Sequence, residues 1–113
     1  MQHEIKMVRD KKVIIAQIAE IANTLELKYS TETNFRNHCY LRIAYDCTLK
    51  NKWDTIISKP FVKNANFEQI TNVVELLNRY LLDKNKLITD NSTSLNFRKL
   101  AKLSIINESQ TLF

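Results

Sequence analysis

The chain of 113 residues contains no glycine and a single proline, Pro60. Glycine normally supplies the positive-φ positions of tight hairpin turns and of phosphate-binding loops. Its absence disfavours a hairpin-rich β fold and excludes the glycine-rich motifs of P-loop and dinucleotide-binding proteins. We therefore expect an all-α fold, a compact single-domain bundle of four to five helices over residues 1–113.

The composition is that of an ordinary soluble protein, with 44% hydrophobic and 26% charged residues. No apolar run approaches the roughly 18 to 20 residues of a membrane-spanning helix, and the N-terminal segment lacks the pattern of a secretory signal. We therefore expect a cytoplasmic protein that does not contact membranes. The net charge of +5 has two explanations. It reflects either an acidic partner or the lysine- and asparagine-rich bias of AT-rich codons.

The two cysteines do not indicate a disulfide or a metal site. Cys39 and Cys47 are eight residues apart, which is about 12 Å along one helix and too far for a bond between them. The chain has only two histidines, His3 and His38, so a structural zinc site is not expected. We predict no metal and no cofactor.

The first helical pattern starts at Asp10, a possible N-cap, and runs to about Leu27. Its apolar positions recur at helical spacing: Ile14, Ile18, Ile21 and Leu25. Lys28 to Ser30 is predicted to be a connection. Residues 1–9 and 107–113 are predicted to be flexible ends of the domain.

A second helix is predicted from a cap at Thr31 or Thr33 to about Ile57, although Asn51 can divide it into two. A loop over residues 59–65 follows. Asn66 and Gln69 then have the spacing of a capping box, and the helix after them presents Phe67, Ile70, Val74, Leu77 and Leu81 on one face.

The C-terminal part of the chain carries a weaker pattern. Leu87 and Ile88 predict one turn or a brief helix. Ser92 or Thr93 can cap a last helix with apolar side chains at Phe97, Leu100, Ala101 and Leu103.

The segment from Asn37 to Cys47 combines polar and apolar residues. At about 100° per residue, one face collects Phe35, His38, Cys39, Arg42, Tyr45, Asp46, Leu49 and Trp53. Arg42 and Asp46 are four residues apart and can pair directly.

This stripe has two interpretations. It is either the solvated edge of a mostly buried helix or part of a cleft in which Arg42 binds an anion. The second interpretation assigns a ligand site to His38, Arg42, Tyr45, Asp46 and Trp53. Neighbouring helical residues point about 100° apart, so His38 is not expected to activate Cys39. We assign no catalytic residue, and enzyme activity is not favoured.

Two basic clusters suggest an acidic partner. Lysines surround Trp53 and Phe61 in the segment from Lys50 to Asn64, an arrangement that suits single-stranded nucleic acid. The candidate contacts with nucleic acid or an acidic protein surface are Lys50, Lys52, Lys59, Lys63, Arg98, Lys99 and Lys102.

Three functions follow from these patterns. The first is a binding protein that engages an acidic partner through the basic clusters. The second is an anion-binding protein or enzyme with a cleft around Arg42. The third is a regulatory interaction or inhibitor module, and self-association into an oligomer stays open with it.

Overall fold

A computed structural model describes the backbone of residues 2–111 and the side chains of residues 10–104. Within this range the elements are α1 (Gln2–Thr33), α2 (Asn37–Leu49), the 3-10 helix η1 (Trp53–Thr55), α3 (Phe61–Asn64), α4 (Phe67–Leu82) and α5 (Lys84–Thr111). No strand occurs between residues 2 and 111. The predicted all-α bundle is confirmed. None of the described helices has the length and apolar character needed to cross a bilayer.

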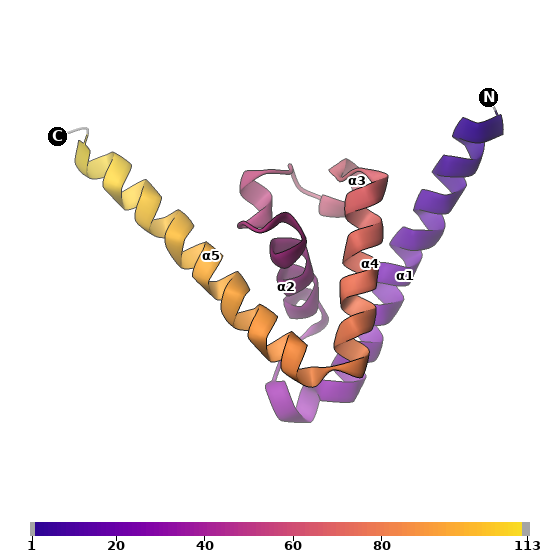
Figure 1. The fold of residues 1–113 in the computed structure, drawn as a ribbon, viewed down its shortest axis with the longest axis horizontal. Coiled ribbons are helices and arrows are strands. Elements are labelled where there is room, and N and C mark those ends of the chain that lie inside the picture. Colours follow the sequence, from indigo (N-terminus) through magenta and orange to yellow (C-terminus); the bar gives the residue numbers. More distant parts are fainter. Residues whose placement is uncertain (1, 112–113) are drawn as a thin grey trace.

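The helices form a flat, V-shaped molecule (Figure 1). The long helices α1 and α5 diverge as its two arms, and α2 and α4 lie between them. The longest dimension is 55 Å and the radius of gyration is 16.0 Å, whereas a compact chain of this length has a radius of gyration of about 13 Å. The C-terminal part of α5 therefore extends beyond the bundle (Figure 1).

The apolar core joins α1, α2 and α4, and Phe61 of α3 and Leu87 of α5 also contribute to it. Ile18 and Leu25 of α1 are buried, and Ile14 and Ile21 pack against the same core, which confirms the predicted face of the first helix. On α4 the predicted face is confirmed in the same way. Ile70 and Leu77 are buried, while Phe67, Val74 and Leu81 are partly buried.

Helix α1 is longer than predicted at both ends. It begins at Gln2 rather than Asp10 and continues through the predicted connection to Thr33. The continuation is stabilised by Tyr29, which is buried and donates a hydrogen bond from its hydroxyl to the carbonyl oxygen of Tyr80 at 2.9 Å. The helix ends before Asn34, whose φ is 59°.

Thr31 and Thr33 do not cap a second helix, because both lie in the last turn of α1. Helix α2 starts at Asn37 and ends at Leu49 rather than near Ile57. Lys50 adopts a left-handed conformation with φ of 56°. The observed structure therefore matches the alternative in which the pattern breaks close to Asn51. The predicted loop over residues 59–65 contains the short helix α3.

Helix α4 begins with the predicted capping box. The Gln69 N–H donates to Asn66 Oδ1 at 2.8 Å, and the Asn66 N–H donates to Gln69 Oε1 at 2.9 Å. Since the first N–H groups of a helix have no acceptor within the helix, these two bonds help to fix where α4 begins.

Helix α5 is continuous where two shorter pieces were predicted. Asp83 caps its start by accepting a hydrogen bond from the Lys86 N–H at 3.1 Å. Ser92 and Thr93 are not caps: they lie inside the helix and donate to the carbonyl oxygens of Ile88 and Thr89. The cap is thus nine residues earlier than the sequence suggested.

The prediction of flexible ends over 1–9 and 107–113 stays a prediction. Residues 1, 112 and 113 lie outside the described backbone, and the side chains of the other residues in these segments lie outside the described residues.

Candidate functional site

Asp46 joins three segments of the chain. Its side chain is fully buried on α2. Oδ2 accepts hydrogen bonds from Ser94 Oγ at 2.7 Å and from Arg98 Nε at 2.8 Å, both on α5. Oδ1 accepts from the Trp53 N–H at 3.0 Å, at the start of η1, and from Arg98 Nη2 at 3.3 Å. Because a buried carboxylate must be paired, Asp46 fixes both α5 and η1 against α2.

Arg42 also contacts α5. Its Nη1 donates to Ser94 Oγ at 3.0 Å and its Nη2 to Asn91 Oδ1 at 2.8 Å. Asp46 forms its ion pair with Arg98 and not with Arg42, so the direct Arg42–Asp46 pair expected from their spacing is wrong. In this structure the guanidinium of Arg42 ties α2 to α5.

The other candidate ligand residues lie elsewhere. His38 is exposed near the start of α2. Tyr45 is buried and stacks on Phe61 with a centroid distance of 3.8 Å, while Trp53 contacts both rings edge-on. Burial raises the pKa of Tyr45 to about 12. Of the five residues predicted to bind a ligand, Arg42 and Asp46 contact α5, and Tyr45 and Trp53 belong to an aromatic cluster. His38 is exposed and lies apart from both groups.

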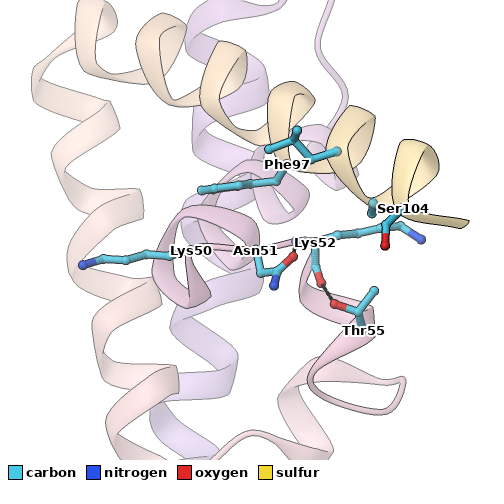
Figure 2. A pocket seen from close by; sticks show the side chains of 8 residues that line it. Lys50, Asn51, Lys52, Thr55, Phe97 and Ser104 are labelled. Atoms are coloured by element: carbon cyan, nitrogen blue, oxygen red, sulfur yellow. Dashed lines mark hydrogen bonds between the residues drawn. The ribbon is translucent and has the colours of Figure 1, made fainter. Parts of the chain in front are cut away.

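A hollow of about 570 Å³ opens between α5 and the segment that follows α2. We call it the groove, and it is lined by Lys50, Asn51, Lys52, Thr55, Phe97, Leu100, Ala101 and Ser104. Figure 2 shows Phe97 between α5 and this segment; Lys52 extends towards Ser104, and Lys50 extends in the opposite direction. The groove brings two lysines of one predicted basic cluster to the apolar positions of the last predicted helix.

The polar contacts of Asp46 hold the two walls of this groove in place. Ser94 and Arg98 lie on α5 beside the residues of the α5 wall, and Trp53 lies in the segment from residue 50 to residue 55 that supplies the other wall. Sequence reasoning missed the groove because spacing within the last predicted helix does not show how that helix lies against residues 50–55. With α5 continuous, residues 91, 94 and 98 share the face that meets α2, and residues 97, 100, 101 and 104 share the adjacent face.

Some predicted basic contacts are paired within the protein. Lys52 and Lys59 lie 3.4 and 3.6 Å from the carboxylate of Asp54. Burial alone raises the pKa of Asp54, but these two ammonium groups outweigh it and the net pKa is lowered. Arg98 is held by Asp46.

The remaining predicted contacts are exposed: Lys50, Lys63, Lys99 and Lys102. Among the residues with described side chains, no carboxylate lies within 4.0 Å of their ammonium groups. At 100° per residue, Lys99 and Lys102 lie about 150° around α5 from the centre of the groove face. Lys50 and the pair of Lys99 and Lys102 therefore lie on two different sides of α5.

Both cysteines are free thiols. The surroundings of Cys47 do not activate it as a nucleophile. Cys47 Sγ lies 3.4 Å from the carbonyl oxygen of Asp90, and burial raises its pKa to about 12. A thiol this weakly acidic is a poor nucleophile at neutral pH. Among residues 10–104, no group of three histidine, cysteine, aspartate or glutamate side chains is placed to hold a metal ion.

The groove and the Asp46 contacts define a helical protein with a solvent-facing basic and apolar surface. Comparison with protein families, with curated proteins and with solved structures finds no match to this chain.

Proposed function

We propose that this protein is a binding protein that engages an acidic macromolecule at the groove. The observation that carries the proposal is the combination of an apolar floor, formed by Phe97, Leu100 and Ala101, with the lysines Lys50 and Lys52 on the facing wall. Apolar area supplies affinity, while charge selects the partner and speeds association. The net charge of +5 also attracts an acidic partner, over a longer distance than the groove lysines alone.

The other basic residues have a secondary role in this proposal. Lys59 lies in the segment between η1 and α3, and Lys63 lies in α3. Lys99 and Lys102 are on the side of α5 that faces away from the groove. Their charges attract an acidic partner without contacting it in the groove. The proposal includes an intracellular setting, in which Cys39 and Cys47 remain reduced.

A salt titration tests the proposal. Fluorescently labelled polyglutamate and single-stranded DNA and RNA oligonucleotides are titrated with the protein, and binding is measured by anisotropy. We expect binding at low ionic strength that weakens steadily as salt is added, because charge pairing is screened and counterions are displaced. Absence of binding to every probe at low ionic strength contradicts the proposal.

Two variants with equal charge changes locate the site. Lys50→Ala with Lys52→Ala removes two charges from the groove, whereas Lys99→Ala with Lys102→Ala removes two from the opposite side of α5. We expect the first pair to weaken binding more than the second. Equal losses in the two variants contradict a site in the groove.

A further inference from the structure

We propose that the partner in the groove is an acidic amphipathic α-helix of another protein. This inference rests on the proposed function and specifies its partner. An amphipathic helix lays an apolar stripe into an apolar groove and keeps its charged side chains at the rim. The groove has an apolar floor for the apolar stripe of such a helix and lysines at its rim for the acidic side chains.

The length of the groove suits two turns of a helix. Its α5 wall runs from Phe97 to Ser104, which at 1.5 Å per residue is about 10 Å. Phe97, Leu100, Ala101 and Ser104 follow the spacing of one helical stripe. Leu100 is 54% exposed, so a partner side chain that covers it removes apolar surface from water.

The rim of the groove favours acidic side chains. Lys50 is exposed, and Lys52, whose ammonium group lies 3.4 Å from Asp54, extends towards Ser104 on the α5 wall (Figure 2). Asn51, Thr55 and Ser104 add neutral polar groups around the apolar floor. Glutamate or aspartate residues flanking the apolar stripe of a partner helix would meet these lysines.

A nucleic acid fits this surface less well. Stacking of bases requires accessible rings, but Phe61 is 2% exposed and Trp53 packs against both Phe61 and Tyr45. Among the described residues that line the groove, only Phe97 is aromatic. Exposed lysines lie on two sides of α5 and do not form one track for a phosphate backbone.

A second copy of the chain is also a poorer occupant. Each copy has a net charge of +5, and the groove itself carries lysines. Two copies that met at this surface would bring like charges together, which costs binding free energy. Charge complementarity therefore selects an acidic partner over self-association.

The experiment uses two synthetic peptides of identical leucine and glutamate composition. In the first peptide the leucines recur at three- and four-residue spacing, so that they form one helical stripe; in the second they are scrambled. We expect the first peptide to bind at least about tenfold more tightly, which corresponds to about 1.4 kcal/mol. It should also gain helical circular dichroism when it binds.

Two matched variants of the protein complete the experiment. Leu100→Asp places a charge on the groove floor, and Leu95→Asp changes a leucine of similar exposure, 52%, outside the groove lining. We expect Leu100→Asp to abolish the preference for the striped peptide and Leu95→Asp to preserve it. Circular dichroism confirms that both variants are folded.

Four results would overturn the inference. Equal, salt-dependent binding of both peptides contradicts a helical partner but leaves the proposed function intact. Tighter binding of single-stranded oligonucleotides than of the striped peptide favours nucleic acid instead. Self-association that Leu100→Asp abolishes, measured by sedimentation, identifies a second copy as the occupant. If no acidic probe binds at low ionic strength, both the inference and the proposed function fail.

Discussion

The α1–α4 contact and the α2–α5 contact are built from different chemistry. Helices α1 and α4 bring apolar side chains such as Ile18, Leu25 and Leu77 to a common core. Helices α2 and α5 meet through a partly buried polar network, in which the buried Asp46 and Ser94 contact Arg98, Arg42 and Asn91. One contact depends mainly on buried area, and the other depends on the geometry of charged hydrogen bonds.

This difference explains how α5 is held. Apolar contacts are non-directional and tolerate adjustments in helix angle. A carboxylate that accepts two bonds from one guanidinium, one from a hydroxyl and one from a backbone N–H sets the position of each donor. The polar contact therefore orients α5 relative to residues 50–55, and this orientation forms the groove.

The largest effect is expected for Asp46→Ala. The substitution leaves Arg98, Ser94 and the Trp53 N–H without their buried acceptor, so we expect a loss of about 3–5 kcal/mol in the free energy of unfolding. Urea unfolding followed by circular dichroism measures the change. Asp46→Asn keeps the shape but loses the charge and should cost less. A loss below about 1 kcal/mol in Asp46→Ala would contradict the role assigned to Asp46.

Leu77→Ala tests the apolar contact in the same assay. Leu77 is fully buried on α4, and truncation of a buried leucine costs about 2–5 kcal/mol. Under conditions where the variant is folded, we expect peptide binding in the groove to be unchanged, because the Asp46 contacts remain. If peptide binding weakens in the folded Leu77→Ala variant, the two contacts do not have separate roles.

The burial of Tyr45, which precedes Asp46 on α2, can be tested by the pH dependence of stability. Its folded pKa is about 12, whereas an unfolded tyrosine has a pKa of about 10. Between these two pKa values the folded state retains a proton on Tyr45 that the unfolded state loses. The contribution of this hydroxyl to the free energy of unfolding is therefore fully present below pH 10 and is lost as the pH rises towards 12. Tyr45→Phe should therefore reduce the alkaline loss of stability by up to about 3 kcal/mol, since one pKa unit corresponds to about 1.4 kcal/mol. Identical losses in both proteins would contradict the burial of this hydroxyl.

The smallest effect is expected for Arg42→Ala. Arg42 makes two hydrogen bonds to neutral groups at a half-buried position, and we expect a loss of about 1–2 kcal/mol in the free energy of unfolding. The same chemical denaturation assay measures it. A loss as large as that of Asp46→Ala would show that the two residues act as one unit.

Much of the fold could be predicted from the sequence. The three- and four-residue spacing of apolar side chains identified the inward faces of α1 and α4, and the Asn66–Gln69 capping box located the start of α4. The bounds of other helices were wrong where tertiary contacts or alternative caps decided them. Tyr29 extends α1 by bonding to Tyr80, and Asp83 takes the place of Ser92 or Thr93 as a cap.

The candidate site was only partly predictable. Helical angles placed Arg42 and Asp46 on one stripe, but spacing within one helix cannot identify a partner 52 residues away such as Arg98. A direct pair between Arg42 and Asp46, four residues apart on one helix, was the simpler interpretation. The lysines of the groove were identified as candidate contacts, whereas their position opposite Phe97 depends on the orientation of α5.

A nuclear magnetic resonance titration with the striped acidic peptide tests the central claim most directly. We predict that the amide resonances of residues 50–55 and 97–104 shift together, because both walls of the groove contact the peptide. Resonances of the α1–α4 contact, including Leu25 and Leu77, should stay in place. Shifts confined to the far side of α5 around Lys99 and Lys102, with residues 50–55 unaffected, would contradict the account.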